Sequence, residues 1–287
     1  MALPPYRGRL APSPTGLLHL GHAATFWQAF ARTRDHSSTL LLRIENLDTQ
    51  RSKPRFTEAI LEDLAWLGIA WQSPILYQSQ RFPLYHKALD QLLTTRHIYP
   101  CHCSRKDLSG MMHAPHEDTD DEPVYPGICR PTPNASSQKL SFHSNVNYRF
   151  RISDGESITF GDQNLGLQSF TAGKDFGDFL VWRKALSQNP SDVGLPSYQL
   201  ACVVDDADTN ITEIVRGRDL LKSTARQILL QRALNLPTPA YFHTQLLTDE
   251  HGIRLAKRHD ALAIRTLRQQ GLTPEEVIRM ATATAKK

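Results

Sequence analysis

Strand-like and helix-like segments alternate along the first third of the chain, and this order constrains the fold more than any other feature. A strand-like segment at residues 9–11 ends in a Pro/Gly loop and is followed by a helical pattern over 21–32. The apolar run 39–44 has the length of a buried parallel strand, and helical patterns follow over 54–67 and 82–94. Strands that alternate with helices predict an α/β domain with a parallel sheet.

The alternation breaks after residue 98. From Tyr99 to about Asn147 the chain is rich in Cys, His, Pro, Ser and Asp, and we interpret this stretch as part of an inserted subdomain. The segments expected after it are strands at 148–152, 157–160, 179–182, 199–204 and 212–215, a helix at 219–234 and a strand near 242–247. Two helices are expected in the tail, and the second opens with Thr273-Pro274-Glu275-Glu276, a capping-box signature.

The composition of the 287 residues is that of an ordinary globular protein, with 40% hydrophobic and 22% charged residues. No apolar run reaches the length of a membrane span, and the N-terminus lacks the apolar core of a signal peptide. We therefore expect a cytoplasmic protein without a membrane partner. The net charge of +4 is compatible with binding a polyanion, but a slightly basic soluble enzyme explains it equally well.

The loop between the first strand and the first helix carries chemistry. Gly16 and Gly21 allow a close approach of backbone or ligand, and the start of the helix offers N–H groups and a positive dipole end to phosphates. His19 and His22 lie three residues apart, so both can share one face of a helical turn. There they can donate hydrogen bonds to a phosphoryl transition state. On spacing alone, surface histidines would be the simpler interpretation.

A second motif, Gly252-Ile253-Arg254-Leu255-Ala256-Lys257-Arg258, follows a strand and precedes a helix. Its three cations suit a pyrophosphate leaving group, on which negative charge grows in the transition state. Taken alone, such a run is more often a solvated basic loop.

The two motifs together resemble the HIGH-type and KMSKS-type signatures of class I aminoacyl-tRNA synthetases, in order and in separation. They read His19-Leu20-Gly21-His22 and Arg254-Leu255-Ala256-Lys257-Arg258. The blocks that narrow the resemblance to glutamyl-tRNA synthetases are Arg9-Leu10-Ala11-Pro12-Ser13-Pro14-Thr15-Gly16, Leu42-Arg43-Ile44-Glu45-Asn46-Leu47-Asp48, Val203-Val204-Asp205-Asp206 and Ile214-Val215-Arg216-Gly217-Arg218-Asp219. Two positions depart from that family, because Arg258 stands where serine is usual and Asn46 where aspartate is common.

This resemblance, which covers the chain from about Arg7 to Lys257, implies an α/β fold. The fold would be a Rossmann-type class I synthetase catalytic domain with an inserted zinc-containing acceptor-like subdomain and a short C-terminal helical tail. The expected parts are the first half of the catalytic domain at 1–98, the inserted subdomain at 99–195, the second half with the KMSKS-like loop at 196–258, and the helical tail at 259–287.

The resemblance also implies roles for individual residues. The residues expected to bind glutamate are Arg9, Ser13, Glu45, Tyr198 and Arg216. The residues expected to bind ATP, accompanied by Mg²⁺, are His19, Gly21, His22 and Lys257, with His19, His22 and Lys257 as the catalytic residues. The residue types suit these roles, because arginine pairs with carboxylates and a glutamate side chain pairs with an ammonium group. Taken alone, Arg9 as a surface cation and Glu45 in an ordinary ion pair would be simpler interpretations.

Three of the four cysteines lie close together in the sequence, as Cys101-His102-Cys103 and Cys129. Clustered thiolates suit zinc, which prefers four tetrahedral ligands, and the residue types leave a histidine as the fourth ligand. The candidate histidines are His102, His113 and His116. The resemblance instead implies Tyr125 as the fourth ligand of one structural zinc ion. Reduced structural cysteines are the alternative, and Cys202 in its apolar run is expected in the core.

About thirty residues follow Lys257, whereas full-length glutamyl-tRNA synthetases carry an anticodon-binding region there. The chain therefore resembles the glutamyl-queuosine tRNA(Asp) synthetases. That resemblance implies activation of L-glutamate with ATP, followed by transfer of glutamate to the queuosine base in the anticodon of tRNA(Asp). We expect a monomer that contacts the anticodon stem-loop through phosphates, stacking and splayed bases.

Three other functions fit part of the same pattern. A minimal glutamyl-tRNA synthetase would share the first step and charge a tRNA 3′ end, although the expected lack of the C-terminal region argues against it. The sequence alone does not exclude a free-standing adenylate-forming enzyme with a non-RNA acceptor. A non-catalytic zinc-containing RNA-binding module is disfavoured by the presence of His19, His22, Glu45, Arg216 and Lys257.

Overall fold

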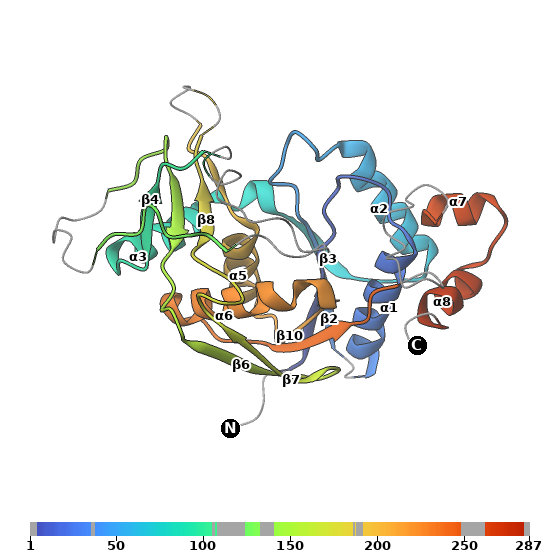
Figure 1. Ribbon diagram of the computed structural model, residues 1–287. Helices are drawn as coiled ribbons and strands as arrows, with labels where there is room; N and C mark the ends of the chain where they lie inside the picture. The colour runs from blue at the N-terminus through green and yellow to red at the C-terminus, as the bar shows by residue number, and fades with distance from the viewer. Residues whose placement is uncertain are drawn as a thin grey trace.

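The computed structural model describes residues 5–35, 38–104, 107, 124–132, 141–185, 187, 192–247 and 262–283. In chain order its elements are β1 (Arg7–Leu10), α1 (Leu20–Asp35), β2 (Thr39–Ile44), α2 (Pro54–Trp66), β3 (Gln72–Tyr77), η1 (Gln78–Gln80), α3 (Phe82–Thr94), β4 (Ile98–Cys101), β5 (Asn147–Phe150), β6 (Ser157–Asp162), β7 (Gly166–Thr171), β8 (Phe179–Arg183), β9 (Leu195–Pro196), α5 (Tyr198–Asp208), β10 (Glu213–Gly217), η2 (Arg218–Leu220), α6 (Leu221–Leu234), β11 (Ala240–Thr244), α7 (Ile264–Gln269) and α8 (Pro274–Ala283). Figure 1 shows the parallel strands at the centre, an antiparallel sheet at one end, and α7 and α8 at the other.

The parallel strands form the centre of an α/β fold, as the alternation predicts. β1, β2 and β3 pair in parallel, and β10 pairs in parallel with β11. β10 lies beside β1, because the N–H of Thr212 donates to the carbonyl of Arg7 at 3.0 Å. Arg9 reaches the carbonyl of Val215 at 3.1 Å, so the two strands run in the same direction. The resulting order β3-β2-β1-β10-β11 is that of a doubly wound nucleotide-binding fold, in which ligands bind at the carboxyl ends of the strands where the order reverses.

The remaining strands extend the molecule on one side. β4, β5, β8 and β9 form an antiparallel sheet, while β6 pairs with β11 and forms a hairpin with β7. All six strands from β4 to β9 lie between Ile98 and Pro196, close to the expected insertion at 99–195. Whether this part is a separate subdomain stays a prediction.

The strand predicted at 199–204 is wrong, because this segment belongs to helix α5. The hydroxyl of Ser197 accepts the N–H of Leu200 at 3.3 Å and caps the helix. α5 packs against α3, α6 and β8, so its apolar residues are buried on every side. A continuous apolar run does not distinguish a buried strand from a buried helix, and periodicity alone could not have decided the matter.

Other departures are smaller. β11 ends at Thr244, earlier than the strand expected near 242–247, and the strands β3, β4, β7 and β9 were not expected. β3 begins with exposed residues and contains Pro74, both of which weaken the strand pattern in its sequence and are typical of an edge strand. Among the helices that the structure describes, none combines the length and the apolar character needed to cross a lipid bilayer.

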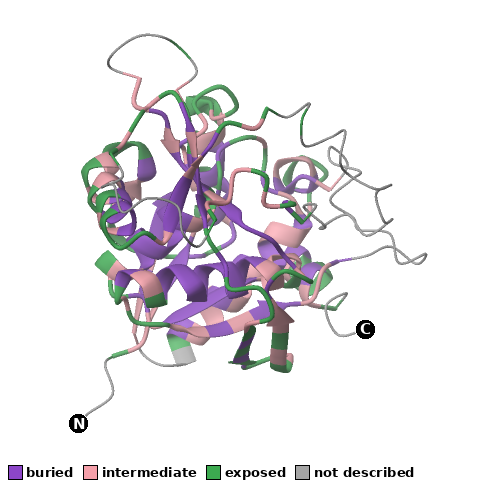
Figure 2. Ribbon diagram, turned by 60° about the vertical axis from the view of Figure 1, so that its left-hand side comes forward, coloured by how far each residue is buried: buried purple, intermediate pink, exposed green. Residues whose placement is uncertain are grey.

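Two apolar cores hold these layers together. One lies around α3, α5, α6 and the antiparallel sheet, and the other joins α1, β1, β2 and α2 to the tail helices. Figure 2 shows buried residues running through the central helix and the strands around it, with exposed residues on the outer elements. α1 contacts both β10 and α8, so the tail packs beside the parallel sheet.

The capping box predicted at the start of the last helix is confirmed. The carboxylate of Glu276 accepts the N–H of Thr273 at 2.8 Å, and the hydroxyl of Thr273 accepts the N–H of Glu276 at 3.3 Å. We expect Thr273→Ala to lower the free energy of unfolding by about 1 kcal/mol in urea titrations. Thr282→Ala is the control, since its hydroxyl bonds the carbonyls of Ile278 and Arg279 within the same helix and does not cap the helix start. Equal losses in both variants would contradict the capping role.

Candidate active site

Five buried charged side chains meet where β1, β2 and β10 end beside α5, and we call Arg9, Arg43, Glu45, Asp206 and Arg216 the charge cluster. Each of them is at most 9% exposed. Arg43 lies at the centre, with Nη1 at 2.5 Å from Asp206 and Nη2 at 3.0 Å from Glu45. Arg9 Nε also contacts Asp206, at 3.3 Å. The parallel sheet therefore gathers charges from three strands and one helix at its carboxyl edge.

A further buried carboxylate borders the charge cluster, because Asp205 Oδ2 lies 3.7 Å from Nε of Arg43, while its Oδ1 lies 2.6 Å from Nε of Arg81. Burial favours the neutral form of the Glu45 carboxyl and raises its pKa, which the nearby guanidinium groups of Arg43 and Arg9 oppose. Although burial acts in the same sense on Asp206, Arg43 and Arg9 outweigh it and lower the pKa of that carboxyl. Burial raises the pKa of the adjacent Cys202 thiol well above its ordinary value, so the thiol adds no charge.

Arg216 differs from the other cations of the cluster, because no carboxylate of the described residues lies within 4.0 Å of it. Its Nη2 donates to the hydroxyl of Thr224 at 2.7 Å, and its Nε donates to His243 at 3.3 Å. Its Nη1 is buried without a hydrogen-bond partner among those residues. A buried cation and an unsatisfied buried N–H are both costly, and an anionic ligand would relieve both costs.

Two further predicted residues border the charge cluster. Tyr198 is the first residue of α5, is 39% exposed, and interacts electrostatically with Arg216 and Glu45. Ser13 is exposed in the loop after β1, and the carbonyl of the preceding Pro12 accepts the N–H of Glu45 at 3.0 Å. The structure thus places all five residues predicted for glutamate around one edge of the sheet.

The two signature histidines adopt a defined geometry at the start of α1. The N–H of Gly21 donates to Nδ1 of His19 at 3.1 Å, and the N–H of His19 donates to Nδ1 of His22 at 3.2 Å. Because both Nδ1 atoms accept, each neutral ring carries its hydrogen on Nε2. A Cβ at Gly21 would lie 3.1 Å from the ring of His19, which explains the glycine. Both rings therefore present an N–H donor, as the predicted role toward phosphate requires.

The residues that follow the KMSKS-like loop contact the start of α1, where the signature histidines lie. Ala263 forms a bridge with His19, and the N–H of Leu20 donates to the carbonyl of Leu262 at 3.1 Å. Before the loop, Leu247 is buried in the same apolar core as Leu20. Lys257 and Arg258 lie outside the described residues, so their predicted roles remain predictions.

Several residues of the site were missed by the sequence analysis. Arg43 is a charged residue within the apolar run of β2, and Asp206 ends the apolar run of α5. A charged residue in a buried run usually has a buried partner of opposite charge, so the sequence carried a signal for both residues. His243 and Asp162, which stand behind Arg216, carry no sequence signal. The departure at Asn46 has a local reason, since its amide both donates to and accepts from Ser79, at 2.9 and 3.0 Å.

The cysteine cluster lies beside β4. The Sγ atoms of Cys101, Cys103 and Cys129 all lie within 4.8 Å of one another, and the hydroxyl of Tyr125 is 3.5 Å from two of them. Tetrahedral zinc with Zn–S bonds of about 2.3 Å separates its sulfur ligands by about 3.8 Å. The guanidinium group of the buried Arg149 lies 3.3 Å from Cys101 and 3.9 Å from the Tyr125 ring, which suits negatively charged ligands.

This donor set fits a metal ion such as zinc, with the tyrosine oxygen near the fourth corner. Among the competing histidines, His102 is exposed, while His113 and His116 lie outside the described residues.

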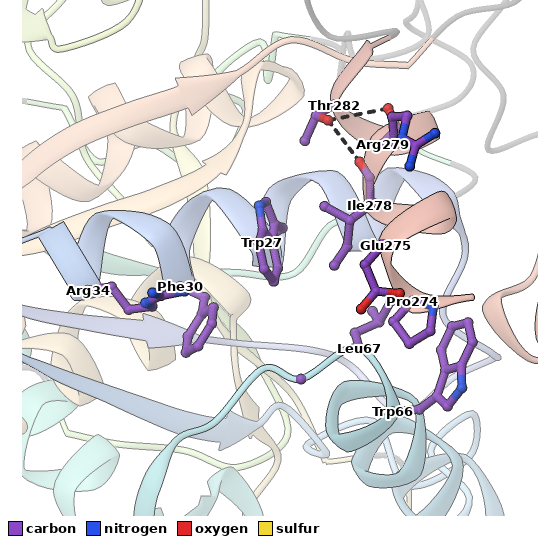
Figure 3. Close-up of a pocket in the computed structure, with 11 residues that line it drawn as sticks. Trp27, Phe30, Arg34, Trp66, Leu67, Pro274, Glu275, Ile278, Arg279 and Thr282 are labelled. Carbon is purple, nitrogen blue, oxygen red and sulfur yellow. Dashed lines mark hydrogen bonds between the residues drawn. The ribbon is translucent and has the colours of Figure 1, made fainter. Parts of the chain in front are cut away.

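A separate hollow of about 650 Å³ lies between α1, the end of α2 and α8 (Figure 3). Aromatic and aliphatic side chains line it together with two arginines, and the labelled residues include Trp27, Phe30, Trp66, Ile278 and Arg279. None of the residues predicted to bind substrate or metal lines it. The hollow is therefore not part of the candidate active site.

Comparison with known proteins agrees with this geometry. Residues 6–284 match the family described as tRNA synthetases class I (E and Q), catalytic domain. A Glutamyl-Q tRNA(Asp) synthetase of Rhodopirellula baltica is 42% identical over 282 residues, which are 96% of this chain and 84% of that protein. Another, from Symbiobacterium thermophilum, is 42% identical over 280 residues, which are 94% of this chain and 84% of that protein.

A solved structure is similar as well. The crystal structure of a glutamate tRNA ligase from Elizabethkingia meningosepticum, in complex with its amino acid, superposes with a TM-score of 0.76 at 25% identity. The match covers 97% of this chain and 60% of that one, so the chain spans less than two thirds of the ligase. The chain belongs to the class I tRNA synthetases (E and Q), a family of aminoacyl-tRNA synthetase-type ligases.

Proposed function

We propose that this chain activates L-glutamate with ATP and transfers the glutamyl group to the queuosine base of tRNA(Asp). The observation that carries the first step is Arg216, a buried guanidinium group with an unsatisfied N–H and no carboxylate among its described neighbours. One carboxylate of glutamate would pair with Arg216 and the other with Arg9, while Glu45 would pair with the ammonium group.

In the first step the α-carboxylate of glutamate attacks the α-phosphorus of ATP in line. A bond forms between the carboxylate oxygen and phosphorus, the bond to the oxygen that bridges to the β-phosphate breaks, and pyrophosphate leaves. Mg²⁺ bound with ATP would offset the negative charge of the phosphates. His19 and His22 donate their Nε2–H groups to phosphate oxygens, and Lys257 contacts the phosphates. Positioning and charge stabilisation account for the catalysis, and no protein nucleophile is needed.

In the second step a hydroxyl of the queuosine cyclopentenediol attacks the activated carbonyl carbon. An ester bond forms, the mixed-anhydride bond breaks, AMP leaves and the hydroxyl proton is released. The names of the relatives that share about two fifths of the sequence support this acceptor. Charging of a tRNA 3′ end is the second candidate, because the glutamate tRNA ligase shares the fold over 97% of this chain.

The cysteine cluster is proposed to hold one structural zinc ion through Cys101, Cys103, Tyr125 and Cys129. Its support is the spacing of the three Sγ atoms and the phenol oxygen, together with the buried cation of Arg149 beside them. The ion would cross-link residues on either side of the segment 105–123 and would take no part in the reaction.

A transfer assay tests the function. Labelled glutamate, ATP and Mg²⁺ are incubated with tRNA(Asp) that carries queuosine, tRNA(Asp) that lacks it, and tRNA(Glu). We expect label only on the queuosine-bearing tRNA(Asp). Labelling of tRNA(Glu) would make the chain a minimal glutamyl-tRNA synthetase, and pyrophosphate exchange without any labelled tRNA would point to a different acceptor.

A further inference from the structure

A buried chain of hydrogen bonds continues behind Arg216 into the neighbouring strands. Nδ1 of His243, on β11, lies 2.6 Å from Oδ2 of Asp162 at the end of β6. Nε2 of the same imidazole lies 3.3 Å from Nε of Arg216 and 3.0 Å from the hydroxyl of Thr224, which itself accepts from Nη2 of Arg216. All three side chains are buried, with exposures of 0%, 5% and 5% for His243, Asp162 and Arg216.

The hydrogen positions in this chain follow from its ends. A guanidinium Nε–H can only donate, so Nε2 of His243 is an acceptor. The carboxylate of Asp162 can only accept, so Nδ1 of His243 carries the hydrogen. Burial and the nearby Arg216 lower the pKa of His243 to about 4, and the ring is therefore neutral at neutral pH. The neutral ring separates the guanidinium from the carboxylate, and the charge of Arg216 stays available to a ligand.

Asp162 is itself held in place by the backbone. Its Oδ1 accepts the N–H groups of Asn164 and Leu165 at 3.0 and 2.8 Å, and its Oδ2 accepts the N–H of His243 at 3.1 Å. The carboxylate is thus oriented by the turn after β6, and the imidazole by the carboxylate. The turn between β6 and β7 thereby fixes the geometry of one residue in the charge cluster.

We propose that Asp162 and His243 are positioning residues for glutamate, which act by fixing the His243 tautomer that accepts from Arg216. The proposal rests on the proposed function, because it takes Arg216 as the residue that binds a carboxylate of glutamate. The guanidinium is then oriented before the ligand arrives, which reduces the cost of ordering it on binding.

The sharpest variant is Asp162→Asn, which is nearly isosteric. Three backbone N–H groups lie within 3.3 Å of Oδ1 and cannot change, whereas the imidazole can change its tautomer, so the amide oxygen takes that place and the NH₂ group faces Nδ1 of His243. His243 must then accept at Nδ1 and carry its hydrogen on Nε2, which faces the hydroxyl of Thr224 and can no longer accept from Nε of Arg216. We expect the KM for glutamate in pyrophosphate exchange to rise about 10- to 100-fold, with the KM for ATP within about threefold of its original value.

Two further variants separate positioning from general damage to the core. His243→Gln keeps an amide acceptor for Arg216 and has no tautomers, so Asp162→Asn should cost much less in that background. Tyr241→Phe is the matched control, because Tyr241 lies on the same strand as His243 and its buried hydroxyl accepts from Gln231 on α6, while the ring next to Arg216 is kept. We expect it to keep both KM values unchanged.

Histidine ¹⁵N NMR of the unliganded chain gives a readout that needs no activity. We expect His243, assigned through His243→Gln, to carry its hydrogen on Nδ1 in the unchanged chain and on Nε2 in Asp162→Asn. A different tautomer in the unchanged chain would overturn the proposal. So would an unchanged KM for glutamate, or equal effects of Asp162→Asn in both backgrounds. If the tautomers are as expected but the chain does not activate glutamate, the proposed function fails instead.

Discussion

Replacing Arg216 with glutamine is expected to lower kcat/KM for glutamate in pyrophosphate exchange by about 100-fold or more. A hydrogen bond to a charged group contributes about 1.5–3 kcal/mol, and a bidentate pair with a carboxylate contains two of them. Each 1.4 kcal/mol is a factor of ten. The loss should fall on glutamate, because the contacts of Arg216 are to Thr224 and His243, not to the signature histidines at the start of α1. The KM for ATP should change by less than about threefold.

The same substitution at Arg226 controls for the loss of a buried arginine. Arg226 on α6 is 8% exposed, and its guanidinium group lies over the ring of Phe176, which is not one of the residues predicted to bind glutamate. Arg226→Gln should lower stability and leave kcat/KM for glutamate within about threefold. If Arg216→Gln behaves like Arg226→Gln in both respects, Arg216 does not bind the substrate. Arg216→Lys should recover little, because an ammonium group cannot reproduce the planar fork of a guanidinium.

The sequence predicted the order of the elements better than their identity. Helices with a proline in the first turn, such as α2 and α3, begin at the expected residues, because Pro54 and Pro83 mark a local preference that needs no tertiary contact. The apolar run 199–204 predicts a strand because it has no helical periodicity, and the elements that bury it as a helix, α3 and α6, lie outside the run. Whether a wholly buried apolar run forms a helix or a strand depends on the elements that pack against it, and the local sequence does not specify those elements.

The sequence predicts only those site residues that belong to a recognisable motif. The signature histidines, Arg9, Glu45 and Arg216 stand in recognisable blocks, and the structure gathers Arg9, Glu45 and Arg216 in the charge cluster. Asp162 and His243 stand 81 positions apart, and only the pairing of β6 with β11 joins them. Residues on different strands that orient a binding residue have no characteristic spacing in the sequence, so only the structure identifies them.

Replacing Cys129 with serine is expected to abolish the zinc content of the purified chain and to lower its thermal stability. A metal ion that binds only the folded state stabilises it by about 4 kcal/mol when free zinc is 1,000-fold above Kd. The effect should be large here, because the cluster joins Cys103 to Cys129, whose Sγ atoms are 3.5 Å apart although 26 positions separate them. Metal analysis and thermal unfolding with and without a chelator measure both quantities.

Two matched variants test which side chains hold the ion. Cys202→Ala should retain one zinc per chain, because Cys202 lies beside Glu45 in the charge cluster and not beside the other cysteines. Tyr125→Phe keeps the ring beneath Arg149 and removes only the oxygen that lies 3.5 Å from Cys101 and Cys103. If the oxygen is a ligand, this variant should lose zinc to a chelator at a concentration that leaves the unchanged chain loaded. Retention by Tyr125→Phe together with loss by His102→Ala would instead identify the histidine as the fourth ligand.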